Sequence, residues 1–275
     1  MEIMDVTEIL KDACKQVYDQ TKGLIGTQEG NEGLGRGAGG DVSRKIDIVA
    51  ESAVIEFVRR HDFRPTIISE ECGRIEGRDD GILVLDAIDG TNNTLREIPF
   101  YCCSIAYARN SKLTSTIHAT VMDLSNGDLY HASDKQGAFL NNEEVHVVRS
   151  LDFAGDHDLS DMLVGLNISG MPKNLIMSMV NVISEVNHIR QFGANALELC
   201  YLARGFLDAY IDIRGKIRAT DVAAAYLILR EAGGKMYDND GYELDCELDN
   251  NTRLSFVAAA NEDIYNRIAG LLKSQ

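Results

Sequence analysis

The stretch GILVLDAIDGTNN, residues 81–93, decides the fold prediction. Its apolar run ILVL predicts a buried strand, and the strand ends in Asp86. Asp89 follows three positions later, directly before Gly90 and Thr91, where the chain has to turn sharply. A strand that ends in this way projects its last side chains into the crevice beyond its carboxyl end, where open α/β sheets bind ligands. The free backbone amides after such a turn can hold an anion.

A second acidic pair stands at the end of another short apolar run. Glu70 and Glu71 follow the strand-like TIIS and precede Gly73, and Glu70 lies sixteen residues before Asp86. Acids at strand ends often face water or cap helices, so one such pair is weak evidence for a site. Carboxylates beside an anion site repel phosphate unless divalent cations lie between them, and hard cations prefer carboxylate oxygens. The two acidic pairs together therefore predict a metal-assisted phosphate site.

Composition narrows the class of protein. With 275 residues and 45% hydrophobic content, the chain can bury a sizeable core in one large domain or two fused ones. The formal net charge of −16 argues against partners such as nucleic acid or an anionic membrane, and acidic residues suit divalent cations better. The longest apolar runs are too short to span a membrane, and the acid-bearing N-terminus differs from a signal peptide. We therefore expect a cytoplasmic protein.

The six cysteines do not form a CxxC pair, and most of them stand in apolar segments. Reduced thiols in such segments behave as small hydrophobic side chains. Neither a zinc site nor a disulfide framework is expected.

The first half of the chain predicts helices that cover a mainly antiparallel sheet. Helical spacing of apolar residues appears in 3–17 and again in 46–58. Between them, the Gly-rich stretch 29–41 predicts a mobile loop without regular structure, and its formal GxGxxG lacks the preceding strand of a dinucleotide site. Strands are expected at 66–69, 81–86, 103–109, 114–122 and 127–132, followed by a hairpin turn at Asn141 and Asn142.

The second half alternates between strands and helices, which is typical of a separate α/β layer. Strands are expected at 162–167, 188–192, 206–212, near 236 and at 254–259, and helices at 174–186, 194–204, 220–232 and from Asn261 onward. We place a domain boundary near 150, which gives an N-terminal α+β metal-binding domain (1–150) and a C-terminal α/β substrate domain (151–275). DNDGYELD at 238–245 lacks the ligand spacing of a calcium loop and reads as a hairpin turn.

Several of these segments together resemble the inositol monophosphatase and fructose-1,6-bisphosphatase superfamily. They are SEECG, VLDAIDGTNN, the Asp of SRKIDIVAE twenty-three residues before Glu70, and IRATDVAAAYLILREAGG. The resemblance covers nearly the whole chain in the expected order. DIRGKIRATDVAAAYLILREAGG resembles the archaeal type, which acts on both fructose 1,6-bisphosphate and inositol monophosphates. The resemblance implies an α/β (α+β) sugar phosphatase fold, a five-layered αβαβα sandwich, and a homodimer.

The resemblance also implies a set of hard-oxygen Mg2+ ligands. They are Glu70, Asp86, the carbonyl of Ile88, Asp89 and Asp221. Two or three Mg2+ ions are implied, with Mn2+ as a substitute, and Asp86 bridges two of them. Ala87 stands where the family usually has Pro, which removes a fixed φ and no functional atom. Arg36 stands in the loop where other members carry a Lys near a third ion. The resemblance therefore does not decide whether a third ion binds.

Family members hydrolyse phosphate esters by direct attack of a metal-bound water, without a covalent intermediate. Carried onto this chain, the catalytic residues are Asp47, Thr91 and Glu70, with Thr91 and Asp47 activating the water. A Thr hydroxyl hydrogen-bonded to a carboxylate can fix the line of attack. Read from the residues alone, Asp47 is better explained as a solvated residue on a helix that starts near Ser43, and only the motif match favours the catalytic role. Glu71 is expected to support the ligands or to face solvent.

Substrate-binding residues follow from the same resemblance and from charge. The candidates are Gly90, Thr91 and Asn92 for phosphate, Gly193, Ala194 and Asn195 for substrate hydroxyls, and the cations Arg190, Arg214 and Arg218. Asn195 is equally well explained as part of a helix N-cap and its first turn. Arg214 stands where members that prefer inositol phosphate often have Glu, and Arg can clamp a second phosphate but cannot accept hydrogen bonds. Lys216 adds to this basic cluster.

The expected function is a Mg2+-dependent phosphatase of sugar and polyol phosphate monoesters, with fructose 1,6-bisphosphate or inositol 1-phosphate as substrate. One rival is a phosphatase of NADP or of 3′-phosphoadenosine nucleotides, activities that the superfamily also contains. Another rival is a non-catalytic ion-binding module on the same fold. Retention of the water-activating pair, Asp47 and Thr91, argues against the module.

Overall fold

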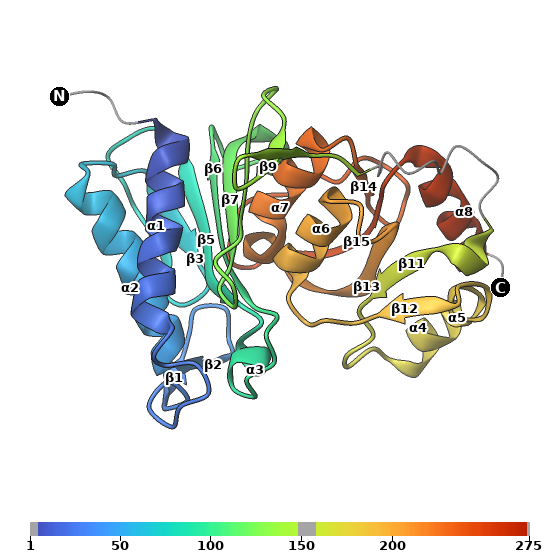
Figure 1. Cartoon of the computed structure of the whole chain (residues 1–275), viewed down its shortest axis with the longest axis horizontal. Helices are drawn as coiled ribbons and strands as arrows, with labels where there is room; N and C mark the ends of the chain where they lie inside the picture. Colours follow the sequence, from blue (N-terminus) through green and yellow to red (C-terminus); the bar gives the residue numbers. More distant parts are fainter. Residues whose placement is uncertain (1–4, 148–157, 274–275) are drawn as a thin grey trace.

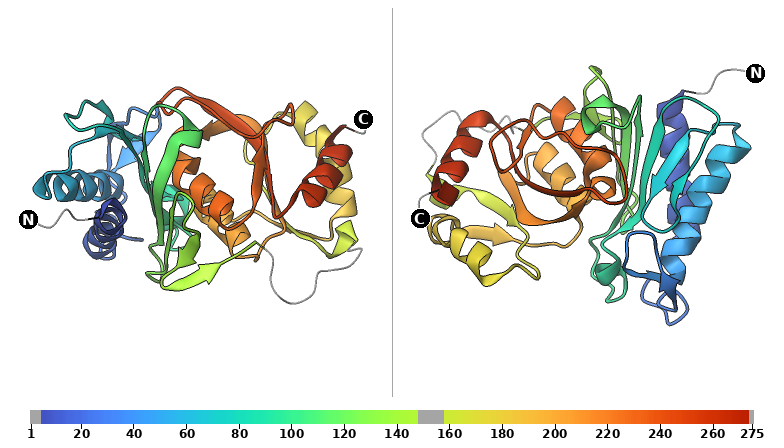
Figure 2. Two further views of the ribbon diagram at one scale, coloured as in Figure 1. Left: turned by 90° about the horizontal axis from the view of Figure 1, so that it is seen from above. Right: turned by 180° about the vertical axis from the view of Figure 1, so that it is seen from behind.

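The computed structural model describes residues 5–147 and 158–273, and its elements stack in five layers (Figure 1). The helices are α1 (Val6–Thr21), α2 (Lys45–Arg60), α3 (Thr91–Thr94), α4 (Lys173–Ser178), α5 (Val180–Glu185), α6 (Asn195–Ala203), α7 (Ala219–Glu231) and α8 (Glu262–Lys273). Helices α1 and α2 are followed by a first sheet, then by α6 and α7, then by a second sheet, and finally by α4, α5 and α8 (Figures 1 and 2). The predicted αβαβα sandwich is confirmed.

The first sheet has eight described strands in the order β10-β9-β8-β7-β6-β5-β3-β4. They are β3 (Thr66–Ser69), β4 (Gly73–Ile75), β5 (Ile82–Asp89), β6 (Cys102–Ala108), β7 (Thr116–Asp123), β8 (Leu129–Ser133), β9 (Ala138–Leu140) and β10 (Glu143–Val145). Strands β3 and β5 are parallel, and the other neighbouring pairs are antiparallel. All eight residues of β5 are buried because α2 and α7 both pack on it, which explains its continuous apolar run.

The second sheet has five described strands in the order β12-β11-β13-β15-β14. They are β11 (Leu163–Leu166), β12 (His188–Arg190), β13 (Ala209–Arg218), β14 (Lys235–Tyr237) and β15 (Arg253–Ala259). Strand β11 is parallel to β12 and β13, whereas β15 is antiparallel to β13 and β14. The carboxyl ends of the parallel strands therefore meet at one edge, next to the start of α6.

The helices differ in composition because their layers differ. Helix α1 covers the outside of the first sheet, and only one face is buried, with Leu10, Ala13 and Val17 fully excluded from solvent. Helix α7 lies between the two sheets, and its alanine run 223–225 is fully buried. Small side chains on several faces let both sheets approach this helix. Among the described residues, no helix combines the length and apolarity needed to cross a bilayer.

Two predictions about local structure are wrong. The Gly-rich stretch 29–41 contains a strand, β1 (Gly33–Arg36), which pairs with β2 (Val42–Arg44) in a two-stranded ladder. Gly40, with a φ of 95°, lies in the turn between the two strands, and Gly35, with a φ of 116°, lies at the register shift of the ladder. The helix expected at 174–186 is two short helices, α4 and α5, which meet at the fully buried Met179.

The strand expected at 206–212 is β13, which begins later than predicted, at Ala209, and continues beyond the predicted end to Arg218. The domain boundary predicted near 150 lies outside the described residues. A single core cluster contains Val84 of the first sheet, Leu227 of α7 and Phe256 of the second sheet. The division into domains 1–150 and 151–275 stays a prediction.

Candidate active site

A β-bulge near the end of β5 explains the spacing of its two aspartates. Residues three apart on a regular strand point to opposite faces of the sheet. Against β6, Asp86 pairs with Ser104 and Asp89 with Cys102, so two residues of β5 oppose one residue of β6. Both residues of the bulge, Ala87 and Ile88, pack in the core cluster that contains the α2 side chains. The bulge thus turns Asp86 and Asp89 toward the same side, where α6 and α7 begin.

Three carboxylates from three elements converge there. Each of Glu70, Asp86 and Asp221 offers one oxygen, and these oxygens all lie within 4.8 Å of one another. We call these three residues the acid cluster. Glu70 follows β3, Asp86 lies on β5, and Asp221 is in the first turn of α7. Among the described residues, Asp89 is not part of this compact group; its Oδ2 accepts a hydrogen bond from Ala196 N of α6 at 2.6 Å.

The cluster is electrostatically unfavourable without added positive charge. Burial, together with repulsion from the Asp221 carboxylate, raises the pKa of Glu70 to about 8, although Arg218 opposes the shift. Burial also raises the pKa of Asp86 well above its usual range, with added repulsion from Glu70 and Asp89. The pKa of Asp221 is raised by burial as well. An all-oxygen, buried and mutually repelling set of carboxylates is chemistry that suits a hard divalent cation.

Asp47 and Thr91 lie close together beside the cluster. Thr91 Oγ1 donates to Asp47 Oδ1 at 3.4 Å, and it lies 3.2 Å from the carbonyl oxygen of Ile88. Asp47 is only 5% exposed, so the alternative of a solvated residue is wrong. Its Oδ2 accepts from Arg44 N at 2.8 Å, which places Asp47 in the first turn of α2 as part of the helix cap.

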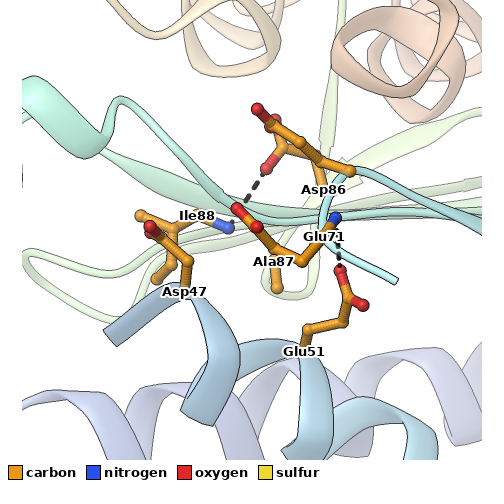
Figure 3. Close-up of a pocket in the computed structure, with 7 residues that line it drawn as sticks. Asp47, Glu51, Glu71, Asp86, Ala87 and Ile88 are labelled. Carbon is orange, nitrogen blue, oxygen red and sulfur yellow. Dashed lines mark hydrogen bonds between the residues drawn. The ribbon is translucent and has the colours of Figure 1, made fainter. Parts of the chain in front are cut away.

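A pocket lies between Asp47 and two members of the acid cluster, Glu70 and Asp86 (Figure 3). It is lined by Asp47, Glu51, Glu70, Glu71, Asp86, Ala87 and Ile88. Glu51 was missed in the sequence, although it stands one helical turn after Asp47 on the same face of α2. Its buried carboxylate accepts hydrogen bonds from Ser69 Oγ at 2.9 Å and from Cys72 N at 2.8 Å. Glu51 therefore fixes the turn that presents the acids at 70 and 71.

Residues 193–195 lie next to Asp89, because the N-terminus of α6 bonds to that carboxylate. The N-cap of α6 is Ala194 and Asn195 is the first residue of the helix, so Asn195 lies in the first turn but is not the cap itself. Asn195 Oδ1 instead accepts from Tyr210 Oη at 2.7 Å. Gly193 has a φ of 89°, and its N–H donates to the fully buried Glu198 at 3.0 Å. The buried Glu198 carboxylate therefore anchors the loop that contains Gly193.

The predicted basic residues are engaged in separate interactions. Arg214 Nε donates to both oxygens of the fully buried Asp212, at 2.9 and 3.0 Å, and Arg214 Nη1 donates to Ser169 O at 2.9 Å. Arg190 is exposed and donates to Ile189 O at 2.9 Å. A role for Arg214 as a phosphate clamp stays a prediction, and it requires the guanidinium to share or leave Asp212.

Comparisons with known proteins relate the chain to several phosphatases. The chain is 35% identical over 271 residues to the fructose-1,6-bisphosphatase/inositol-1-monophosphatase of Methanothermobacter thermautotrophicus, covering 94% of each protein. It is 32% identical to the bifunctional NADP phosphatase/NAD kinase of Methanococcus maripaludis, where 98% of this chain matches but spans about half (49%) of that protein. A crystal structure of an inositol monophosphatase-fructose 1,6-bisphosphatase superimposes with a TM-score of 0.85 at 27% identity, covering 98% of this chain and 100% of that one.

The phosphatase names of these relatives define a class, the phosphoric monoester hydrolases, and confirm the predicted enzyme class. Within that class, the model of the inositol monophosphatase family matches residues 3–275. The chain belongs to this family, as its sequence motifs predict.

Proposed function

We propose that this protein hydrolyses sugar and polyol phosphate monoesters with the help of bound Mg2+. The observation that carries the proposal is the convergence of Glu70, Asp86 and Asp221, from three separate elements, at oxygen distances within 4.8 Å. Asp89 and the Ile88 carbonyl complete the proposed ligand set. Two or three ions, with Mn2+ as a substitute, remain part of the proposal.

The chemistry of the donor set supports this assignment. Every donor is an oxygen, and the described residues add no His or Cys to the acid cluster, which favours Mg2+ or Mn2+ over zinc. When bound, such ions supply positive charge that holds the phosphate, lowers the pKa of a nearby water and stabilises the leaving alkoxide. The acids themselves repel phosphate, so substrate binding depends on this added charge.

The Thr91–Asp47 pair orients the attacking water in the proposed reaction. Thr91 Oγ1 donates its own hydrogen to Asp47 Oδ1, so its lone pairs can accept a hydrogen bond from a water. Asp47 is held by Arg44 N through its other oxygen, which fixes the direction of the whole chain of hydrogen bonds. The pair therefore sets the line of attack and stabilises the positive charge that develops on the water as it attacks.

Replacing Thr91 by Val keeps the shape of the side chain and removes this acceptor. We expect Thr91→Val to lower kcat by about 100-fold or more, because the water loses its orienting partner. Thr120→Val is the control, since Thr120 is a fully buried threonine on β7 whose hydroxyl lies 3.4 Å from Cys14 Sγ rather than beside Asp47. A loss of equal size in both variants, measured as initial rates of phosphate release, contradicts the assigned role.

Burial raises the pKa of Asp47 to about 6, while the backbone N–H of Arg44 opposes the shift. The ionised carboxylate is a stronger acceptor for the Thr91 hydroxyl than the neutral acid and can act as a base, so kcat in the unchanged protein should rise as the pH passes through about 6.

The substrate class is tested by a panel. We expect phosphate release from fructose 1,6-bisphosphate and inositol 1-phosphate. NADP is a second candidate, since the M. maripaludis relative that matches 98% of this chain is named an NADP phosphatase. Measuring kcat/KM for these three and for 3′-phosphoadenosine 5′-phosphate separates sugar from nucleotide phosphatases. Absence of phosphate release from every substrate, in the presence of Mg2+, favours the non-catalytic module.

The proposal includes a small-molecule phosphate ester as the partner, a homodimer and a cytoplasmic location. The net charge of −16 supports the exclusion of nucleic acid and anionic membranes as partners.

A further inference from the structure

Arg218 reaches from the second sheet into the acid cluster. It is the last residue of β13, three positions before Asp221. Its Nη1 lies 2.9 Å from Glu70 Oε1. Its Nη2 donates to Gly39 O at 3.1 Å and to the carboxylate of Asp41. One guanidinium therefore joins a proposed metal ligand to the loop between β1 and β2.

Arg218 carries a positive charge in a largely buried environment. Its side chain is 15% exposed, and its Nε is buried without a hydrogen-bond partner among the described residues. Burial alone would lower the pKa of Arg218, but the nearby Glu70, Asp41 and Asp221 carboxylates raise it above its usual value. The guanidinium therefore stays ionised, and it offsets part of the negative charge of the cluster.

Arg218 and a divalent cation would compete for the same carboxylate. An ion among Glu70, Asp86 and Asp221 would place two further positive charges close to the guanidinium, and both would draw on Glu70. Asp41 is 77% exposed and, with Gly39 O, offers the guanidinium partners outside the cluster.

We propose that Arg218 is a built-in counter-cation that competes with the metal for Glu70 and so lowers metal affinity. The inference rests on the proposed metal-dependent function. By linkage, a metal that displaces Arg218 from Glu70 binds more weakly than it would without that pair, while the pair stabilises the metal-free protein.

Isothermal titration calorimetry of EDTA-stripped, dialysed protein with MgCl2 alone tests the inference without any assay of activity. We expect Arg218→Gln to bind Mg2+ at least about tenfold more tightly than the unchanged protein. Arg218→Lys keeps a charge on a shorter side chain and should lie between the two. The matched control is Arg253→Gln. The positive charge of Arg253 lowers the pKa of Asp221, but its guanidinium donates hydrogen bonds to the carbonyls of Asn250 and Thr252. This control should change the Mg2+ affinity far less.

Thermal unfolding in EDTA provides the second measurement. Metal-free Arg218→Gln should unfold at a lower temperature than the unchanged protein, and Mg2+ should raise its unfolding temperature by more. Equal or weaker Mg2+ binding by Arg218→Gln, or by Arg218→Lys if the first variant does not fold, overturns the competition. Equal tightening in Arg253→Gln also overturns it, because the effect would then be one of net charge. If the unchanged protein binds no Mg2+ at all, the proposed function fails instead.

Discussion

The Asp86→Asn variant is expected to release phosphate at least about 1,000-fold more slowly than the unchanged protein. Asp86 lies within the acid cluster and, through the bulge in β5, on the side of the sheet toward which Asp89 also points. The amide keeps an oxygen that can accept from Ile88 N, a hydrogen bond of 3.1 Å, so the local fold is retained. What is lost is the charge that holds the proposed ions, and steady-state rates on the best panel substrate measure that loss.

The same substitution should not weaken the metal-free protein. Asp86 repels Glu70, Asp89 and Asp221 in the buried cluster, so removing its charge relieves repulsion. In EDTA, Asp86→Asn should unfold at or above the temperature of the unchanged protein. Asp123→Asn is the matched control, because Asp123 is also a buried aspartate (3% exposed) but stands on β7 and accepts from Ser125 N at 2.8 Å. This control should keep its turnover. Loss of activity that merely follows loss of stability in both variants would contradict a metal role for Asp86.

Removal of divalent cations is expected to lower phosphate release at least about 100-fold, and added Mg2+ should restore it. The physical reason is that the pocket is lined by acids, which repel a phosphate ester when nothing compensates them. The measurement is phosphate release after EDTA treatment and dialysis, with Mg2+, Mn2+ or Ca2+ returned in turn.

A control in EDTA saturated with Mg2+ separates chelation from other effects of EDTA. Turnover that survives complete chelation would remove the metal from the mechanism.

Most of the fold could be predicted because its signals are local. The continuous apolar run before Asp86 predicts a strand buried on both faces, and β5 has that position between α2 and α7. The alternation of strands and helices after 158 likewise predicts the second sheet and its helices. The split of 174–186 at Met179 was not predictable, since both α4 and α5 keep helical periodicity and only tertiary packing buries that side chain.

The acidic residues of the site could be predicted from the sequence, but the contacts that position them could not. Glu70, Asp86 and Asp221 carry a motif signal, and the structure brings them together. The bulge at Ala87 and Ile88 depends on pairing with β6, which is a contact between strands that the sequence of β5 alone does not encode. Arg218 forms hydrogen bonds to residues 39–41, which are 177 residues or more away in the sequence. No local sequence pattern could predict these contacts.

The charge of a residue also says little about whether it is available to a ligand. The cations near 214 read as a substrate clamp in the sequence, but Arg214 is held by Asp212, which lies two residues earlier and is fully buried. Any phosphate that approaches Arg214 competes with this pair.

The most direct measurement is a crystal structure of the protein grown with Mn2+ and analysed by anomalous scattering. The proposed site predicts at least one strong anomalous peak in contact with carboxylate oxygens of Glu70, Asp86 and Asp221. Crystals at saturating Mn2+ that show no peak among these three side chains would contradict the metal site on which the proposed phosphatase depends.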